Sequence, residues 1–535
     1  MPASTRFILN DREVETDAPA GLLVLDFLRE HERLTGTKEG CKEGDCGACA
    51  ILIGELNGDA VRYQPVTSCL VPLAEVHGRH VVTIEGCNLA GLNPVQEAVV
   101  EFGGTQCGFC TPGIVVSLHG LLLDNGKGLT LDDVKYALSG HLCRCTGYRS
   151  LKDCAATLEH TLGSRLQANG AASRVPVLTA AGALPEYFTT IPERLRALRA
   201  TIHAAAQTEC GRSRSAESAS LASAADEAAP SVAETPSSAA TAASEVSAGS
   251  DALAAGASAA APAVPPLLIA GGTDLYVQQG ESIPQRLVEV LGARPELKGI
   301  RRAGGEFRVG ALTTFEEFGT HPAVIEAIPR IASFNHLIAS WQIRNRATLA
   351  GNIVNASPIG DFTALLLALD ARIVLAGGGT QRTVPLKEFY RGYKQIDLRP
   401  DELLTEVIFA DPTDARVNFE KVSKRTCLDI ASVNAACSIR QTGDSIREAH
   451  FSVGGVAPIP LYLHETSRAL HGRTLDLDTA WQAVRISQQE IAPISDVRGS
   501  AEYKRLLARQ LLIAHFVILF PDRFAAEAFY AAEGA

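Results

Sequence analysis

The chain has 535 residues, which suggests three or four domains at roughly 150 residues each. Hydrophobic residues make up 46% and charged residues 20%, the balance of an ordinary globular protein. The formal charge is -11 and no basic stripe with interleaved aromatic residues is present, so the sequence gives no indication of nucleic-acid binding.

The N-terminal segment MPASTRFILNDREVE lacks an apolar stretch behind a basic start, so it does not predict a secretory signal peptide. The most apolar late stretch, Leu511–Phe520, is interrupted by His515 and has about half the length of a membrane-spanning helix. We expect a buried helix there, and a cytoplasmic protein without membrane contact.

The chain divides into regions of different periodicity. Residues 1–85 predict strands on either side of a turn at Asn10, around one helix, and residues 86–165 predict a helical domain. Helices of this second region are expected to begin near Asn93-Pro94, at Pro112 and at Thr130, whose side chain can cap the helix.

We expect a linker over 166–184, a further domain over 185–410 and a C-terminal α+β domain over 411–535. The helix Ile191–Ala204 is expected to be an early element of the domain over 185–410. The stretch 213–262 consists mainly of Ala, Ser and Glu, with no aromatic residue and no Ile. It cannot bury enough apolar surface to offset its ordering entropy, so we expect disorder or sparse helix and no catalytic role.

Ten of the 13 cysteines lie between Cys41 and Cys154. An odd cysteine count in a chain without secretory features favours metal binding over a disulfide framework. The first set has the spacing C-x4-C-x2-C-x19-C of a plant-type 2Fe–2S site, with glycines that allow the loop to curl around a cluster. A four-cysteine zinc site is the alternative, although its usual paired C-x2-4-C spacing occurs only once here. The set comprises Cys41, Cys46, Cys49 and Cys69.

The second set combines a C-x2-C pair in TQCGFCTPG with a C-x-C pair in HLCRCTGYR, and comprises Cys107, Cys110, Cys143 and Cys145. Four thiolates on two facing turns can hold a 2Fe–2S cluster, but the spacing alone also suits zinc. A redox C-x2-C motif is a third possibility, without its usual βαβ context. Outside both sets, small buried hydrophobes or inert thiols are expected at Cys87, Cys154, Cys210, Cys427 and Cys437.

Two segments suit a nucleotide. LLIAGGTDLYV is an apolar strand that ends in Gly271-Gly272, where backbone N–H groups can approach a phosphate, although the Rossmann fingerprint is absent. The segment Gln342–Ala371 crowds small and polar residues before an apolar helix that begins near Asp361. We expect part of it to form a loop along a dinucleotide.

GCKEGDCGAC, QCGFCTPG and HLCRCTGYR resemble the N-terminal part of the molybdenum hydroxylase family, which includes xanthine dehydrogenases and aldehyde oxidases. The resemblance implies a β-grasp ferredoxin-like domain and a four-helix-bundle domain, each with a 2Fe–2S cluster. It also implies that the helical-domain cluster lies nearest the molybdenum cofactor, with Gln106 and Cys145 facing the pterin of a partner. A helix-capping role is the ordinary alternative for Gln106.

AGGTDL and ATLAGNIVNASPIGD resemble the FAD-binding domain of the same family, an α+β fold of the vanillyl-alcohol oxidase type. The resemblance implies that Leu268–Asp274 holds the pyrophosphate and that the second segment lines the adenosine and phosphate side. It also implies that Leu404 and Lys421 lie near the adenine and the flavin ring. The implied FAD-binding residues are Leu268, Ala270, Gly271, Gly272, Thr273, Asp274, Ile338, Ala347, Thr348, Gly351, Asn352, Asn355, Asp361, Leu404 and Lys421.

Several of these residues have ordinary alternative roles. Asp361 can be a charge at a helix N-terminus, and Lys421 a solvated lysine. Tyr393 can be a core aromatic, a shield for the flavin face or a contact for NAD+. The chain also has Ala350 where many relatives have glycine, and FAD binding should survive this if φ is negative there. The long insert after Ile191–Ala204 should lie on the surface, because loop-closure cost rises slowly with length.

The order of domains resembles the small subunits of xanthine dehydrogenases. It implies that electrons leave a molybdenum cofactor on a separate large subunit, cross two 2Fe–2S clusters to FAD and reach NAD+ during oxidation of hypoxanthine or xanthine. No general base for the hydroxylation is expected in this chain, and an assembly of two small and two large subunits is implied. The alternatives are an equivalent subunit for aldehydes or N-heterocycles, and an iron–sulfur carrier without catalysis.

Overall fold

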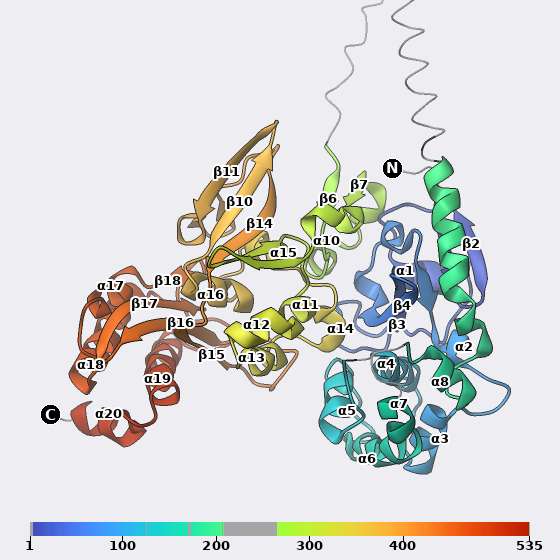
Figure 1. The fold of residues 1–535 in the computed structure, drawn as a ribbon, viewed down its shortest axis with the longest axis horizontal. Coiled ribbons are helices and arrows are strands. Elements are labelled where there is room, and N and C mark those ends of the chain that lie inside the picture. The colour runs from blue at the N-terminus through green and yellow to red at the C-terminus, as the bar shows by residue number, and fades with distance from the viewer. Residues whose placement is uncertain (1–3, 125, 169–172, 206, 208–264, 534–535) are drawn as a thin grey trace, which may run out of the picture.

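The computed structural model describes residues 4–124, 126–168, 173–205, 207 and 265–533. The low-complexity stretch 213–262 lies outside the described residues. The molecule is elongated, with the two N-terminal domains at one end, the C-terminal sheet and helices at the other, and the region that follows residue 265 between them (Figure 1). The multidomain α+β class is therefore confirmed.

The first domain is a five-stranded mixed sheet in the order β2-β1-β5-β3-β4. The predicted hairpin is present, with Asn10 in the left-handed region at φ 53° in the turn. Inward-facing Phe7 and Ile51 pack against Phe27, which follows the short helix α1. The elements are β1 (Thr5–Leu9), β2 (Arg12–Thr16), α1 (Val24–Asp26), β3 (Ala50–Asn57), β4 (Ala60–Thr67) and β5 (His80–Val82).

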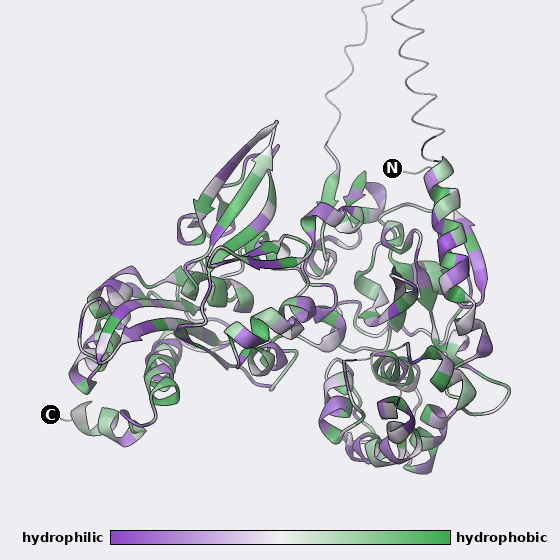
Figure 2. Ribbon diagram, in the orientation of Figure 1, coloured by the Kyte–Doolittle hydropathy of each residue, from purple (hydrophilic) through white to green (hydrophobic). Residues whose placement is uncertain are grey.

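The second domain is helical, and its helices begin where the sequence predicts. Asn93 caps α3 by accepting from the Gln96 backbone N–H, and Thr130 caps α5 by accepting from that of Asp133. Helix α4 is buried along nearly its whole length and is largely green in Figure 2. The helices are α2 (Ile84–Cys87), α3 (Pro94–Glu101), α4 (Thr111–Leu123), α5 (Leu131–Leu138), α6 (Arg149–Leu158) and α7 (Ser164–Ala168).

Residues 173–205 pack on the N-terminal domains instead of acting as a linker and a first flavin-domain helix. Leu178 of α8 (Val175–Ala180) lies in the core of the helical domain. The helix over residues 191–205 covers the first sheet, where Ile191 and Leu195 contact Ile8. The spacing of its apolar residues follows one helical face, and that face needs a hydrophobic surface to cover.

The region from residue 265 to 410 contains a parallel pair of strands, a five-stranded antiparallel sheet in the order β11-β10-β14-β9-β8, and helices that flank both. Its strands are β6 (Leu267–Ile269), β7 (Val288–Val290), β8 (Ile300–Ala303), β9 (Glu306–Gly310), β10 (Arg372–Gly377), β11 (Thr380–Pro385) and β14 (Leu403–Ala410). Its helices include α10 (Leu275–Gln279), α11 (Phe315–Thr320), α13 (Ile331–Leu337), α14 (Trp341–Arg344), α15 (Leu349–Asn355) and α16 (Asp361–Ala368).

The segment expected to form a loop along a nucleotide is mostly helical. Thr348 caps α15 by accepting from the Gly351 N–H at 3.0 Å, and the apolar helix begins at Asp361 as predicted. The cap at Thr348 explains why this part of the segment is a helix and not a loop, because a threonine side chain that accepts from the backbone N–H groups of the first turn favours a helix start.

The C-terminal domain places four antiparallel strands against helices. Leu511 and Phe516 of α19 are buried, so the predicted buried helix is confirmed. Within the described residues, no helix combines the length and hydrophobicity needed to cross a bilayer. The elements are β15 (Ala415–Val422), β16 (Val433–Thr442), β17 (Ser445–Gly454), β18 (Leu461–Tyr462), α17 (His464–Leu470), α18 (Leu477–Glu490), α19 (Ala501–Leu519) and α20 (Ala526–Glu533).

Candidate functional site

The four cysteines of the first set converge in one loop region beside the first sheet. Cys41 and Cys46 hydrogen-bond to each other, and Cys49 and Cys69 form a second such pair. The hydrogen bond from the Cys46 thiol lowers the pKa of Cys41 to about 5. Cys49 and Cys69 are buried, whereas Cys41 and Cys46 are half-buried.

Backbone N–H groups surround these sulfurs, as the glycines predict. The Glu43 N–H donates to the Cys41 sulfur at 3.3 Å, and the Gly44 N–H donates to that of Cys69. Gly44 and Gly47 have φ of +80° and +67°, a region that side chains other than glycine rarely adopt. Such N–H···S bonds stabilise thiolates and tune a bound cluster.

The second set brings together the turn before α4 and the loop between α5 and α6. The Cys145 thiol donates to the Cys107 sulfur at 3.6 Å, and Cys110 hydrogen-bonds to Cys143. Cys107 and Cys145 are exposed, and Cys110 and Cys143 are buried. Gln106 does not cap α4; its amide donates to the Cys145 carbonyl at 3.3 Å and joins the two loops.

The paired arrangement fits a two-iron cluster. Two thiolates bound to one tetrahedral metal with bonds of roughly 2.3 Å lie about 3.8 Å apart, close to the 3.6 Å between Cys107 and Cys145. Each set supplies two such pairs, the donor set that two irons require.

The two thiol sets are neighbours. The Leu142 N–H, next to Cys143, donates to the Cys46 carbonyl at 3.0 Å. A Cβ on Gly47 would lie 2.3 Å from the Gly140 carbonyl oxygen, and one on Gly113 would lie 2.3 Å from that of Gly47. The backbones of the two loops therefore touch with no side chain between them.

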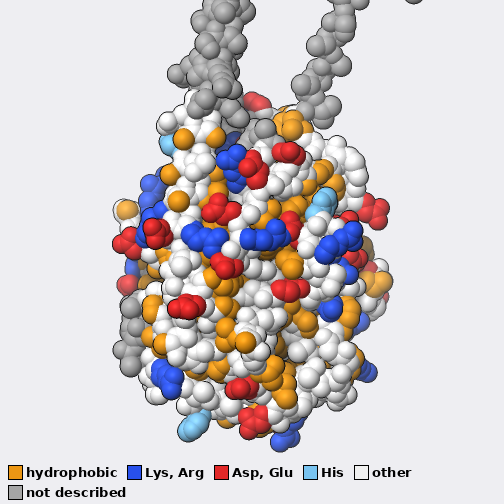
Figure 3. Space-filling view, turned by 90° about the vertical axis from the view of Figure 1, so that its right-hand side faces the viewer, with side chains coloured by type: hydrophobic (Ala, Val, Ile, Leu, Met, Phe, Trp, Pro, Cys, Tyr) orange, Lys and Arg blue, Asp and Glu red, His pale blue; other side chains and the backbone are white. Residues whose placement is uncertain are grey.

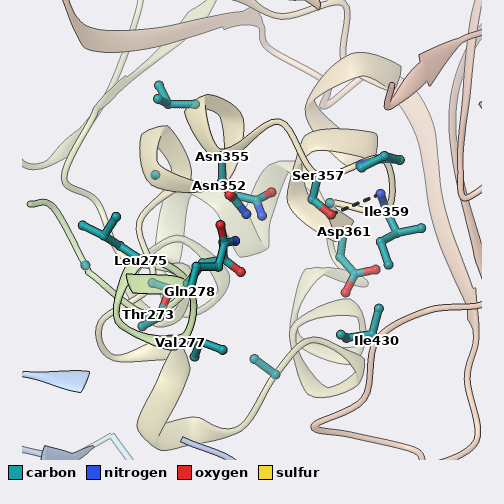
Figure 4. A pocket seen from close by; sticks show the side chains of 18 of the residues that line it. Thr273, Leu275, Val277, Gln278, Asn352, Asn355, Ser357, Ile359, Asp361 and Ile430 are labelled. Carbon is teal, nitrogen blue, oxygen red and sulfur yellow. Dashed lines mark hydrogen bonds between the residues drawn. The ribbon is translucent and has the colours of Figure 1, made fainter. Parts of the chain in front are cut away.

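A cavity of about 1770 Å³ lies between the region after residue 265 and the C-terminal domain. It exceeds the ~300–1,000 Å³ common for small-molecule sites, so it can hold a ligand as large as a dinucleotide. Figure 4 shows Asn352 and Asn355 of α15 and Gln278 of α10 pointing toward one another across it. The predicted residues that line it are Leu268, Ala270, Gly271, Gly272, Thr273, Asp274, Ile338, Ala347, Thr348, Gly351, Asn352, Asn355, Asp361 and Leu404.

Lys421 is the predicted residue that the structure does not bring to the cavity wall. Its side chain is 2% exposed and forms an ion pair with Asp361 at 2.8 Å. Asp361 also accepts from the Asn434 amide at 2.6 Å, so both of its oxygens are held. Lys421 is therefore neither solvated nor a cavity residue. It lies behind the cavity wall and holds the Asp361 carboxylate in place.

Two further expectations concern Ala350 and Tyr393. Ala350 lies inside α15 and is not among the residues with positive φ. The backbone at this position therefore accepts alanine in place of the glycine found in many relatives. Tyr393 lines the cavity and is 63% exposed, which excludes a core role for it.

The cavity also reaches the first thiol set. Glu43 and Asp45, from the loop that carries Cys41 and Cys46, line it together with Ile343. Ile343 packs in the same hydrophobic cluster as Cys49 and Cys69. The hydrophobic cluster that contains the buried thiol pair therefore borders the cavity.

The sequence interpretation missed the C-terminal domain's share of the cavity. Ser432, Gly455, Pro458 and Ile430 line it, next to strands β16 and β17. Gly454-Gly455 at the end of β17, with φ +86° at Gly455, repeats the pattern of a glycine pair after a strand. That pattern was the available signal, and it is the one used for Gly271-Gly272.

Four family models match successive parts of the chain. They are the 2Fe-2S iron-sulfur cluster binding domain over residues 7–74, the [2Fe-2S] binding domain over 83–156, the FAD binding domain in molybdopterin dehydrogenase over 243–411, and the CO dehydrogenase flavoprotein C-terminal domain over 419–517. The two cysteine sets and the cavity lie inside the matching models.

Full-length relatives match across all of these parts. Xanthine dehydrogenase of Drosophila subobscura is 31% identical over 88% of this chain and 36% of its own length. Aldehyde oxidase 1 of Rattus norvegicus is 28% identical over 96% of this chain and 39% of its own. The chain thus spans less than two-fifths of these relatives. Among solved structures, a carbon monoxide dehydrogenase from Hydrogenophaga pseudoflava matches with 30% identity over 46% of this chain and 86% of that chain, at a TM-score of 0.44.

Proposed function

The chain belongs to the molybdenum hydroxylase family, and on that premise we propose that it is the iron–sulfur and FAD subunit of a xanthine dehydrogenase. Its role is to carry electrons from a molybdenum-cofactor-binding large subunit to NAD+ during oxidation of hypoxanthine or xanthine. When bound, the clusters supply one-electron steps and the flavin converts them into hydride transfer.

The spatial order of the three sites carries this proposal. The second thiol set is partly exposed, the first is in backbone contact with it, and the first set's loop lines the cavity. Electrons can therefore enter at the surface and leave at the cavity without crossing a wide gap. The residues proposed to hold FAD are those of the cavity wall, with Lys421 fixing Asp361 from behind.

The surface around the second thiol set suits a protein partner. Phe109 and Leu142, beside these cysteines, are 46% and 59% exposed. Exposed apolar side chains next to an electron-transfer site favour docking of another subunit. We propose the large subunit as this partner, with Gln106 and Cys145 facing its pterin, in an assembly of two small and two large subunits in the cytoplasm.

Several finer assignments belong to the same proposal. The first sheet would be a β-grasp fold, the second domain a four-helix bundle, and the FAD region a fold of the vanillyl-alcohol oxidase type. Tyr393 at the exposed rim of the cavity is available to shield the flavin or to meet NAD+.

The first test is the cofactor content of the purified chain, with about four irons and one FAD expected per chain. Flavin absorption bands beside those of the clusters are expected as well. Zinc in place of iron would reject the cluster assignment, and clusters without flavin would leave only the carrier function.

The second test is turnover of the complex with a co-expressed large subunit. Xanthine plus NAD+ should give urate and NADH. Turnover of an aldehyde or nicotinate, with xanthine inert, would support the alternative substrate classes. These are kept because an aldehyde oxidase and a nicotinate hydroxylase are also among the relatives.

A further inference from the structure

The glycine loop after β6 rests on the iron–sulfur domain as well as on its own. Ile269 and Tyr276, on either side of this loop, pack in one hydrophobic cluster with Leu70 and with the buried pair of the first set, Cys49 and Cys69. The Tyr276 hydroxyl donates to the Gly21 carbonyl of the first domain at 3.0 Å. The loop that lines the cavity is thus a joint structure of two domains, which lie side by side in Figure 1.

Arg346 connects the same two domains with charge. Its side chain is 2% exposed and forms two hydrogen bonds of 2.6 and 2.8 Å to the carboxylate of Glu75, in the first domain. It also donates to the Gly271 carbonyl at 2.7 Å. Burial by itself would raise the pKa of Glu75, but Arg346 holds it below its usual value. Neither charged side chain is among those that line the cavity.

The bond to Gly271 sets the orientation of the loop. Because a trans peptide unit is planar, its C=O and the following N–H point in opposite directions. With the Gly271 carbonyl held by Arg346, the Gly272 N–H points away from Arg346. The close packing of the loop against Arg346 also requires glycine at position 271, because a Cβ on Gly271 would lie 2.2 Å from the Arg346 carbonyl oxygen.

We propose that Arg346, held by Glu75, is a positioning residue for the glycine loop, so that FAD affinity depends on a carboxylate of the iron–sulfur domain. The inference rests on the proposed FAD binding and adds to it a residue outside the FAD-binding region. A guanidinium is suited to this role, because its fork can serve a carboxylate and a carbonyl at once.

The test compares Glu75→Gln and Arg346→Gln in the full chain by titrating FAD into protein stripped of flavin and following flavin fluorescence. Both variants should raise the Kd for FAD about tenfold or more, the loss expected for one hydrogen bond to a charged group. Arg346→Lys should give a smaller rise, because an ammonium retains the ion pair without the planar fork. Iron content and the visible circular dichroism of the clusters should stay at wild-type values.

The matched controls are Arg302→Gln and Asp411→Asn. Arg302 pairs with Asp411 at 2.6 Å in the same region, away from the residues that line the cavity, so FAD affinity should be unchanged. Wild-type FAD affinity in Glu75→Gln would overturn the inference, as would a loss of FAD that occurs only together with loss of iron. If the wild-type chain itself binds no FAD, the proposed function fails. If the wild-type chain binds FAD and the two variants bind it with the same Kd, only the positioning role fails.

Discussion

At the scale of single residues, the cysteine loops depend on positions where glycine is required. A Cβ on Gly40 would lie 2.8 Å from the Cys46 sulfur, and Gly44 and Gly47 have positive φ. These glycines let the chain turn its N–H groups toward sulfur, because glycine adopts positive φ without the steric penalty that other residues have. Among the described cysteines outside the two sets, Cys87 and Cys437 are buried in hydrophobic clusters, and the Cys154 thiol donates to carbonyl oxygens. Cys210 lies outside the described residues.

Replacing Cys143 with serine should remove one of the two clusters. Iron per chain is expected to fall by about half while FAD content is retained, since a two-iron site needs four thiolates. Iron analysis and electron paramagnetic resonance would measure the loss. Cys154→Ser is the matched control, because Cys154 is buried in the same domain and its thiol donates to the Ala98 carbonyl at 3.3 Å, which a hydroxyl can also do. Equal iron loss in both variants would contradict the ligand assignment.

At the scale of elements, the short helix α14 joins three parts of the molecule. Trp341 lies in the core of the helical domain, and the Gln342 amide donates there to the Ala137 carbonyl at 2.8 Å. Three residues on, the Asn345 amide donates to the Pro65 carbonyl of the first domain at 2.9 Å. Figure 1 shows α14 between the flavin region and both N-terminal domains, so one turn of helix fixes their arrangement.

Trp341→Ala should therefore weaken the junction between domains. Truncation of a buried aromatic residue costs about 3–5 kcal/mol, and here the cavity would open in the helical domain although the residue belongs to the flavin region. Calorimetry should show the unfolding transition of the helical domain at lower temperature. Trp481→Ala, in the C-terminal core, should shift a different transition; an identical shift in both variants would argue against the junction role.

At the scale of the whole molecule, the sites are ordered from a surface to an interior. The end formed by the N-terminal domains, seen in Figure 3, shows acidic and basic side chains interspersed on the face in view. The contact between the thiol loops depends on the absence of side chains at Gly47 and Gly113. This close approach sets how near two bound clusters can lie.

Gly113→Ala should push the two N-terminal domains apart. Its added methyl group would clash with the Gly47 carbonyl, and a backbone group cannot move aside as a flexible side chain can. Overpacking of this kind costs about 1–3 kcal/mol of folding stability. A lower melting temperature and slower transfer of electrons from the second cluster to the first are expected, measured by calorimetry and stopped-flow absorption. Gly91→Ala, where nothing lies within 4 Å of the added Cβ, should behave as wild type; a comparable effect there would exclude a specific role for the contact.

The sequence by itself determined the features that depend on neighbours along the chain. Cysteine spacing, the glycines of the first loop, the helix caps at Asn93 and Thr130, and the strand that ends in Gly271-Gly272 are local patterns, and local sterics and hydrogen bonding decide their conformation. Their grouping into two cluster sites and one FAD site came instead from the resemblance to the molybdenum hydroxylase family.

Only the tertiary structure decided which segments meet. The position of the helix over residues 191–205 on the first sheet, the burial of Lys421 behind Asp361, the C-terminal share of the cavity and the pairing of Arg346 with Glu75 join residues far apart in sequence. No local propensity specifies such contacts, because they follow from burying apolar faces and pairing charges when the domains pack together.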